Sequence, residues 1–251
     1  MIYFISDVHL GFYKRKKDIL REDVLLKLLD KLSIDAKEIY FVGDIFDYWF
    51  EYKTVIPKYF YRTLSKIYEL RQKGIKITYL MGNHDFGHHT FFNEEFDIDI
   101  ITKDLDLIIN GKKFYIAHGD GKAYNDTGYL ILKKVLRAKI SNFLFRIIHP
   151  DIGIGVASSS SRSSRNYTDK KEFSQKDGLK DFAINKIENG FDFVIMGHRH
   201  KKEFIKHSYK NKSNIENSGL YINLGEWFED PQVGVFDGNN FKLITVNDFL
   251  N

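Results

Sequence analysis

Five short apolar runs, each ending abruptly in polar residues, constrain the fold of this chain most strongly. They are Ile2 to Ile5, Ile39 to Val42, Ile75 to Met81, Phe114 to Ala117 and Phe193 to Met196. Helical patterns lie between the first three, at Asp18 to Ser33 and at Val55 to Lys73. Buried strands that alternate with amphipathic helices predict an α/β sheet covered on both faces. Such sheets bind ligands where loops leave the strand ends.

The C-terminal part has a different pattern. Its strand-like segments are Glu203 to Tyr209, Gly219 to Leu224, Gly234 to Asp237 and Asn240 to Val246. The sequence Asp237-Gly238-Asn239-Asn240 is typical of a tight turn. We therefore expect antiparallel strands that extend a second sheet.

One segment, from Asp126 to Lys171, lacks a strand pattern. Within it, Gly128 to Ile148 is strongly apolar and carries Lys and Arg but no acidic residue. No linker rich in glycine, serine and proline divides the chain, whose 251 residues are 43% apolar. We predict one domain spanning residues 1–251, with a helical insertion at residues 122–172.

Composition limits both the chemistry and the location. The chain has no cysteine, which excludes disulfides and thiolate metal sites, so nitrogen and oxygen must hold any metal. Its first residues lack the basic region of a signal peptide, and no apolar stretch reaches the roughly 18 residues of a membrane span. We expect a cytoplasmic protein. A net charge of +4 is too mild to predict nucleic-acid binding, but it suits an anionic ligand.

The polar residues after the apolar runs are candidate metal ligands. They are Asp7 and His9 in "DVH", Asp44 in "GD", Asn83 and His84 in "GNHD", His118 in "HGD", and His198 and His200 in "GHRH". Adjacent glycines would let the chain turn sharply, and the two-residue spacing in "DVH" and "HRH" would place both side chains on one side of an extended backbone. A single histidine at a strand end is more often an ordinary surface or core residue. All five motifs in order, each after a strand, favour a site for two metals.

This motif set resembles that of the calcineurin-like metallophosphoesterase superfamily, over Asp7 to His200. The resemblance implies a two-sheet αββα sandwich with a dinuclear centre. By position, Asp7, His9 and His200 would bind one metal ion, Asn83, His118 and His198 the other, and Asp44 would bridge the two. His84 would face the substrate, and Asp85 would orient His84 or cap the following turn.

The expected chemistry is phosphoester hydrolysis. Two divalent ions about 3.5–4 Å apart lower the pKa of a shared water, hold a phosphoryl oxygen and spread the charge of in-line displacement. Attack by the resulting metal-bridged hydroxide makes Asp44 and His84 the predicted catalytic residues, with protonated His84 stabilising the developing charge or protonating the leaving oxygen. The ligand types permit Mn²⁺, Fe²⁺ or Zn²⁺, and the resemblance favours Mn²⁺.

The remaining motifs resemble those of the UDP-2,3-diacylglucosamine diphosphatases of lipid A synthesis. The matching stretches are "GDIFDYWF", "GNHDF", "HGDGKAYNDTGY" and "SRNYTDKK". The resemblance implies that the insertion is a cap that receives acyl chains, and that the enzyme releases UMP and 2,3-diacylglucosamine 1-phosphate. It also implies a set of substrate contacts: Asn83, His84, Asp126, Tyr129, Ser164, Arg165, Lys171 and His198.

The insertion supports this interpretation independently. Leu132, Leu136, Ile140, Phe143 and Ile147 form a helical stripe, and Tyr129, Ile131, Leu144, Phe145 and Ile148 widen it. Apolar surface flanked by Lys and Arg suits a lipid-linked nucleotide sugar, or a membrane surface carrying it, so we expect peripheral association with the inner membrane. The alternative is an ordinary docked helix pair whose basic residues face water. We infer no obligate protein partner, and basic residues interleaved with aliphatic ones disfavour nucleic acid.

Two features depart from the narrower family. Its members have Arg where this chain has His84, and a basic residue where this chain has Ser161, with Arg162 beside it. One alternative is therefore a phosphodiesterase or pyrophosphatase acting on another nucleotide conjugate. The other is a binding module that has lost catalysis, which the seven intact ligand positions argue against.

Overall fold

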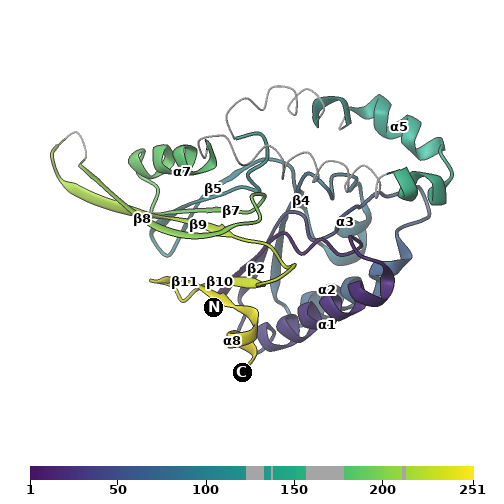
Figure 1. Cartoon of the computed structure of the whole chain (residues 1–251), viewed down its shortest axis with the longest axis horizontal. Helices are drawn as coiled ribbons and strands as arrows, with labels where there is room; N and C mark the ends of the chain where they lie inside the picture. The colour runs from purple at the N-terminus through teal and green to yellow at the C-terminus, as the bar shows by residue number, and fades with distance from the viewer. Residues whose placement is uncertain (123–132, 137, 157–177, 211–212) are drawn as a thin grey trace.

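The computed structural model describes residues 1–122, 133–136, 138–156, 178–210 and 213–251 (Figure 1). Its first sheet has six strands, with β1 to β4 mutually parallel and β10 antiparallel to both β1 and β11. The order across this sheet is β11 (Phe241–Thr245), β10 (Gln232–Phe236), β1 (Ile2–Ile5), β2 (Glu38–Val42), β3 (Lys76–Leu80) and β4 (Ile100–Ile101).

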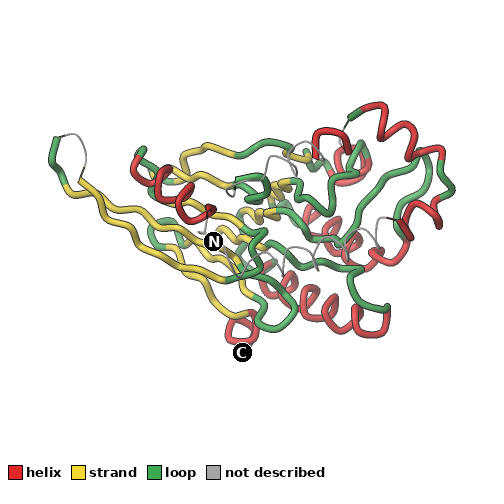
Figure 2. Tube along the Cα trace, turned by 45° about the horizontal axis from the view of Figure 1, so that its top comes forward, coloured by secondary structure: helices red, strands yellow, loops and turns green. Residues whose placement is uncertain are grey.

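The second sheet has five strands, of which the inner three are parallel and the two edge strands are antiparallel to their neighbours. Their order is β5 (Leu105–Ile109), β6 (Lys112–Ile116), β7 (Phe193–Met196), β9 (Glu216–Leu224) and β8 (Lys202–Lys210). The β8–β9 hairpin projects beyond the rest of this sheet (Figure 2).

Helices cover the outer face of each sheet. The first sheet carries α1 (Arg15–Leu32), the 3₁₀ turn η1 (Lys58–Phe60), α2 (Tyr61–Gln72), α3 (Phe91–Phe96) and α8 (Val246–Leu250), and the second carries α7 (Gly178–Glu188). The described part of the insertion consists mainly of α5 (Lys139–Ile147) and the helical residues 150–156. The predicted limit at residue 172 lies outside the described residues, so the division of the chain stays a prediction.

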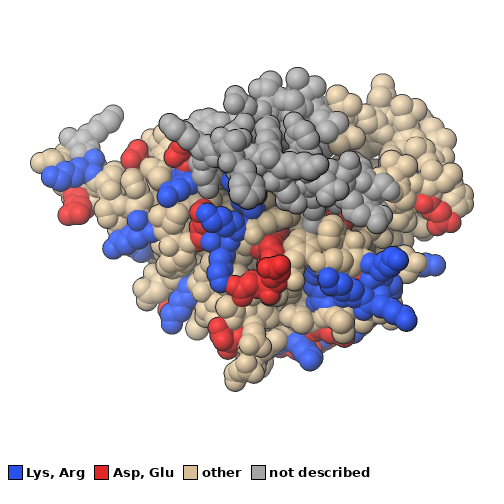
Figure 3. Space-filling view, in the orientation of Figure 1, with Lys and Arg blue, Asp and Glu red and all other residues tan. Residues whose placement is uncertain are grey.

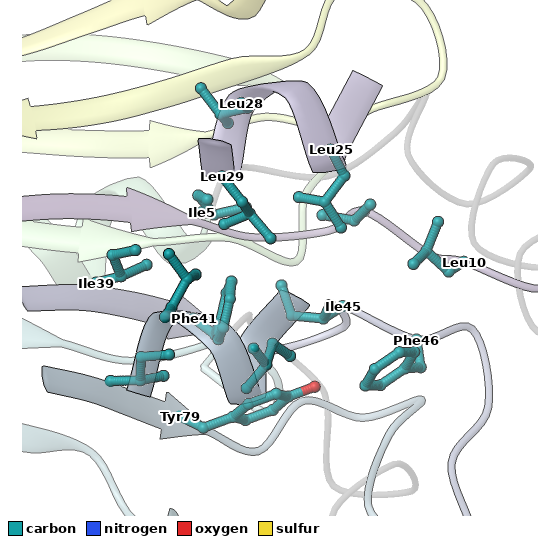
Figure 4. Packing of buried hydrophobic residues seen from close by; sticks show 14 of the residues in the cluster. Ile5, Leu10, Leu25, Leu28, Leu29, Ile39, Phe41, Ile45, Phe46 and Tyr79 are labelled. Carbon is teal, nitrogen blue, oxygen red and sulfur yellow. The ribbon is translucent and has the colours of Figure 1, made fainter. Parts of the chain in front are cut away.

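Three apolar layers hold this arrangement together. In the outer layer on the first sheet, Leu25, Leu28 and Leu29 of α1 pack over Ile5 and Ile39 (Figure 4). Phenylalanines from both sheets fill the layer between them: Phe4, Phe114, Phe193 and Phe236. The third layer joins α7 to the second sheet through Leu179, Ala183, Ile187, Tyr115 and Tyr221. The predicted αββα sandwich is confirmed.

Several elements match their predicted positions, and one helix does not. β1 and β7 have the predicted bounds, and α1 begins at Arg15, earlier than the predicted Asp18. The helix predicted from Val55 begins only at Tyr61, after η1. Pro57 accounts for the difference, because a proline disfavours helical backbone in the residue before it.

The C-terminal strands form antiparallel pairs, but only β8 and β9 extend the second sheet as expected. The prediction was wrong for β10 and β11, which extend the first sheet beside β1. All five residues of β10 are buried: Val233 and Val235 face the helix layer, and Phe236 faces the layer between the sheets. A strand apolar on both faces needs a place in a sheet covered on both sides, which the position beside β1 provides.

Among the described residues, no helix combines the length and hydrophobicity that crossing a bilayer requires.

Candidate metal centre

Loops from both sheets meet at the carboxyl ends of β1, β2, β3, β6 and β7. The backbone N–H groups of Asp7 and His9 donate to the carbonyls of Gly43 and Asp44, at 3.1 and 3.0 Å, which joins the first two loops. The N–H of His198 donates to both carboxylate oxygens of Asp7, at 3.1 and 3.0 Å. These bonds bring residues that are far apart in the sequence to one place.

Asp7, His9 and His200 form one group of converging side chains. His9 Nε2 lies 3.2 Å from His200 Nε2 and 3.7 Å from Asp7 Oδ1, and His200 Nε2 lies 3.5 Å from the same oxygen. Their donor atoms all lie within 4.8 Å of one another. The group has the membership predicted for one metal ion.

Asn83, His118 and His198 form the second group. Asn83 Oδ1 lies 2.9 Å from His118 Nε2 and 2.8 Å from His198 Nδ1. The other ring nitrogen of His118 lies 2.9 Å from the carbonyl of Val42, a contact that sets the direction of the imidazole. The structure thus assembles the three residues predicted for the other metal ion, although their role as ligands stays a prediction.

Asp44 lies between the two groups. Its Oδ2 is 3.2 Å from His118 Nε2 and 3.7 Å from His9 Nε2. This oxygen is buried and accepts no hydrogen bond of good geometry from any residue that the structure describes. A buried carboxylate oxygen without a hydrogen bond destabilises the folded protein unless a cation lies beside it. The nitrogen and oxygen donors around it therefore fit divalent ions.

The backbone of the site is left-handed at five candidate ligands. Asp7, His9, Asp44, His198 and His200 have φ of 54°, 50°, 55°, 71° and 54°. The expected extended backbone in "DVH" and "HRH" is therefore wrong, and left-handed turns make the side chains converge. Such conformations cost about 1–3 kcal/mol each in non-glycine residues and cluster at functional sites.

Two of the glycines next to candidate ligands are needed because the site leaves no room for a Cβ. A Cβ on Gly82 would lie 2.1 Å from Asp44 Oδ1, and one on Gly197 would lie 2.2 Å from Asp7 Oδ2. Neither has the positive φ that a sharp glycine turn implies. Their role is close approach of the backbone to the two carboxylates.

Electrostatics couple the carboxylates to the imidazoles. Burial raises the pKa of Asp7, but hydrogen bonds from His200 and His9 hold it well below its usual range. Burial lowers the pKa of His118, but the charge of Asp44 outweighs this effect and raises it to about 10. Burial and the charge of His118 lower the pKa of His198 to about 4. A proton on His118 thus balances Asp44, a role that a divalent cation would also perform.

His84 is held beside this centre. Its backbone N–H donates to Asp44 Oδ1 at 2.8 Å, and its Nδ1 lies 3.9 Å from Asp47 Oδ1. His9, Asp44 and His84 also have donor atoms within 4.8 Å of one another. The structure therefore places His84 beside the two groups, and its role in catalysis stays a prediction.

Sequence reasoning missed Asp47 and Ser6. Asp47 Oδ1 lies 3.3 Å from His9 Nδ1, and the Ser6 hydroxyl donates to Asp7 Oδ2. Asp47 stands three positions after Asp44 in "GDIFD", and this spacing by itself indicates only a turn. Trp49, in the same "GDIFDYWF" motif, is a core residue 2% exposed.

Asp85 secures the loop that carries Asn83. Its Oδ1 accepts a hydrogen bond from the N–H of Gly82 at 2.7 Å, and its Oδ2 accepts bonds from the N–H of Ile45 and the hydroxyl of Tyr79, at 3.0 and 2.6 Å. The carboxylate therefore joins the loops after β2 and β3.

The described part of the insertion, the predicted cap, rests on the loops that carry the candidate ligands. Phe145 of α5 packs on Phe50, with ring centroids 4.4 Å apart, and Arg146 Nε donates to the carbonyl of Glu51 at 3.3 Å. Lys133 Nζ lies 2.5 Å from Asp120 Oδ2, just after His118. The predicted contacts Asp126, Tyr129, Ser164, Arg165 and Lys171 lie outside the described residues.

Comparison with known proteins shows which family the chain belongs to. The family model described as calcineurin-like phosphoesterase matches residues 1–202. The chain belongs to this family. The protein is accordingly a metal-dependent phosphoesterase, with divalent ions as its cofactors.

Three relatives match nearly the whole chain, and each is named UDP-2,3-diacylglucosamine hydrolase. The protein from Porphyromonas gingivalis is 29% identical, over 98% of this chain and 98% of its own length. The one from Blochmanniella pennsylvanica is 29% identical, over 97% and 95%. The one from Histophilus somni is 26% identical, over 96% and 98%. The similarity thus extends through residues 122–172, the predicted insertion.

Proposed function

We propose that this phosphoesterase hydrolyses UDP-2,3-diacylglucosamine to UMP and 2,3-diacylglucosamine 1-phosphate, a step of lipid A synthesis. The observation that carries the proposal is the exposed apolar surface of the cap, which contacts the loop after β2. In α5, Ile140, Phe143, Leu144 and Ile147 are 74%, 64%, 58% and 67% exposed. The names of the relatives supply the substrate that would cover this surface.

The predicted ligand roles follow the two observed groups. Asp7, His9 and His200 would hold one ion, Asn83, His118 and His198 the other, and Asp44 both. When bound, the ions would supply an activated water and neutralise charge on the diphosphate. We favour Mn²⁺ among the ions that accept this ligand set.

His84 would act on the reacting phosphoryl group. The Asp47 carboxylate lies 3.9 Å from its Nδ1. A protonated His84 can stabilise charge on the phosphoryl oxygens or give a proton to the leaving oxygen. The positive charge of protonated His84 would replace that of the Arg found at this position in the narrower family.

The acyl chains would lie against the cap. Because α5 contacts the body through Phe145 and Arg146, its exposed apolar residues remain available to hydrocarbon. A substrate with two acyl chains resides in a bilayer, so we infer that the protein works at the cytoplasmic surface of the inner membrane. The substrate contacts expected at Asp126, Tyr129, Ser164, Arg165 and Lys171 complete the proposal.

Incubating the purified protein and Mn²⁺ with UDP-2,3-diacylglucosamine, and measuring UMP by chromatography, tests the proposal. UDP-glucosamine without acyl chains and bis(p-nitrophenyl) phosphate serve as comparison substrates, and EDTA as the metal-free control. We expect UMP from the lipid at a kcat/KM far above that for UDP-glucosamine. Equal values for the two nucleotides would reject the lipid substrate.

A second candidate is hydrolysis of another nucleotide conjugate, which His84 favours because histidine is the form used by the wider superfamily. A panel of nucleotide diphosphate esters, assayed under the same conditions, separates the two. A kcat/KM for any water-soluble conjugate above that for the lipid would move this candidate to first place.

A further inference from the structure

A run of basic residues begins α1 on the side of the molecule that carries the cap. Lys14, Arg15, Lys16 and Lys17 surround the helix start, and the side chains of Lys14, Lys16 and Lys17 are exposed. The loop before η1 adds exposed Lys53, and η1 begins with exposed Lys58. We call Lys14, Lys16, Lys53 and Lys58 the basic strip.

The strip lacks acidic partners in the described part of the chain. No ion pair there involves any of its four lysines, whereas other surface lysines pair with carboxylates, such as Lys66 with Asp30 and Lys122 with Asp104. The charges of Lys14 and Lys16 also oppose the dipole of α1, because the N-terminal end of a helix dipole is positive. Stability of the fold therefore does not explain the strip.

Contacts of Tyr59 and Tyr52 link the start of α1, the loop before η1 and the cap. Arg15 Cζ and Lys58 Nζ each lie 5.7 Å from the ring centroid of Tyr59, which connects the start of α1 to η1. The N–H of Tyr52 donates to the carbonyl of Val55, which folds the intervening loop back. A Cβ on Gly153 would lie 2.2 Å from the Tyr52 hydroxyl oxygen, so this tyrosine lies against helical residues 150–156.

The resulting surface is basic at one end and apolar at the other. Figure 3 shows Lys and Arg side chains gathered over the start of α1, below a cap surface that is mostly uncharged on this face but carries acidic side chains on its right-hand side, and Asp151 of the cap is exposed. Between them, Val55 and Tyr59 are 45% and 48% exposed. Lysines, a half-exposed tyrosine and exposed aliphatic side chains are the combination that binds the headgroup region of an anionic bilayer.

We propose that the basic strip docks the protein on an anionic lipid bilayer and turns the cap toward the membrane. The lysines meet the anionic headgroups while α5 and residues 150–156 reach the acyl boundary. The inference deepens the proposed function, on which it rests for the need to reach a lipid. Its physical basis is charge and exposure on this chain.

The expected binding is electrostatic and local. A lysine near an anionic surface is worth about fivefold in affinity, so removing four lowers the apparent affinity on the order of 100-fold or more. Salt weakens the same interaction, because the Debye length falls from about 10 Å at 0.1 M to about 3 Å at 1 M.

The test is flotation of the full chain with vesicles of phosphatidylcholine alone, or of phosphatidylcholine and phosphatidylglycerol at 7:3. One variant replaces the strip: Lys14→Gln, Lys16→Gln, Lys53→Gln and Lys58→Gln. The control makes the same change in charge elsewhere on the surface: Lys37→Gln, Lys103→Gln, Lys113→Gln and Lys210→Gln. Circular dichroism verifies that both variants fold.

We expect the wild type and the control to float with phosphatidylglycerol vesicles, less so at high salt, and the strip variant to remain in solution. Equal loss in the two variants would show that only net charge matters, which overturns the proposal. Equal binding of the wild type to both kinds of vesicle would also overturn it.

Hydrolysis of detergent-dispersed UDP-2,3-diacylglucosamine is measured in parallel. Vesicle binding without hydrolysis would reject the proposed substrate and leave the docking surface standing. Hydrolysis without strip-dependent binding would reject the docking surface and leave the proposed substrate standing. The failure of the docking proposal can therefore be told apart from the failure of the proposed function.

Discussion

Oδ1 of Asp47 lies 3.3 Å from Nδ1 of His9, and both side chains are fully buried. The other ring nitrogen of His9, Nε2, lies 3.2 Å from His200 Nε2. A carboxylate beside Nδ1 favours a proton there, which leaves the lone pair of Nε2 for a metal ion and fixes the direction of the ring.

Replacing Asp47 with Asn should therefore weaken the metal centre without removing a ligand. We expect Mn²⁺ affinity or kcat/KM to fall by about 10–100-fold, as is usual for partners of metal-binding histidines. Equilibrium dialysis measures the affinity. Asp23→Asn, which breaks the partly exposed Arg62–Asp23 ion pair, is the control. Unchanged metal affinity and an unchanged pH profile in Asp47→Asn would contradict the assignment.

Asp44→Ala should abolish turnover and lower metal content. Both ions would share this carboxylate, whose Oδ2 lies between His118 and His9, and its removal leaves their charges less compensated. Metal analysis by plasma emission and a bis(p-nitrophenyl) phosphate assay measure the two effects. Full occupancy together with a near-normal rate would remove Asp44 from the bridging position.

His84→Ala should keep the metal ions and lower the rate of hydrolysis. If its imidazole acts on the phosphoryl group, the loss should be about 10²–10⁴-fold, the usual range for a proton-transfer group. His84→Arg should recover part of the rate, because it restores a positive charge. Loss of metal in either variant would show that His84 is a ligand, as its closeness to His9 and Asp44 allows.

Truncating Leu136, Ile140 and Phe143 to Ala should lower kcat/KM for the lipid by orders of magnitude, since each buried CH₂ is worth about 0.8 kcal/mol. Cleavage of bis(p-nitrophenyl) phosphate, which is too small to reach the cap, provides the reference rate. The three side chains are exposed, so three exposed aliphatic side chains outside the cap, Leu20, Ile34 and Ile108, are replaced by Ala as the control. A folded triple variant that loses activity equally on both substrates, or on neither, would end the acyl-binding proposal.

His88 should make the stability of the metal-free protein depend on pH. Burial, and to a lesser extent the charge of His89, lower the pKa of His88 well below its usual 6.5. The unfolded chain therefore binds one more proton below pH 6.5, and this group lowers the free energy of unfolding by up to about 1.4 kcal/mol per pH unit.

Urea unfolding at pH 7, 6 and 5 measures this contribution. His88→Phe, which keeps a ring against Trp49, should reduce the pH dependence, whereas His207→Gln at the partly exposed Glu188 pair should change it less. Identical slopes for His88→Phe and the wild type would show that the buried imidazole is not the cause.

Local patterns in the sequence were enough to predict much of the fold. Leu25, Leu28, Leu29 and Leu32 repeat at helical spacing, and all four are buried in α1. The run Phe193–Met196 is apolar throughout, and it forms a strand covered on both faces. The spacing of apolar residues along a segment is visible in the sequence itself, so it predicts which side of the segment is buried.

The membership of the site could also be predicted, because each candidate ligand directly follows a strand. Parallel strands place their carboxyl ends at one edge, so Asp7, Asp44 and Asn83 had to lie near one another. The left-handed backbone that aims the side chains could not be predicted, since ordinary residues adopt it only where surrounding contacts impose it.

What only the tertiary structure decided are the pairings between distant segments. Periodicity shows that β10 is apolar on both faces but not which strand it joins, and the prediction placed it in the wrong sheet. The sequence likewise suggests only a turn at Asp47. In the structure the loops after β1 and β2 lie side by side, and the N–H of Asp47 donates to the carbonyl of Leu10 at 2.8 Å. The carboxylate then lies beside His9. Sequence patterns indicate which residues of a segment face the core and which face solvent. Which other segment it packs against depends on packing across the whole molecule.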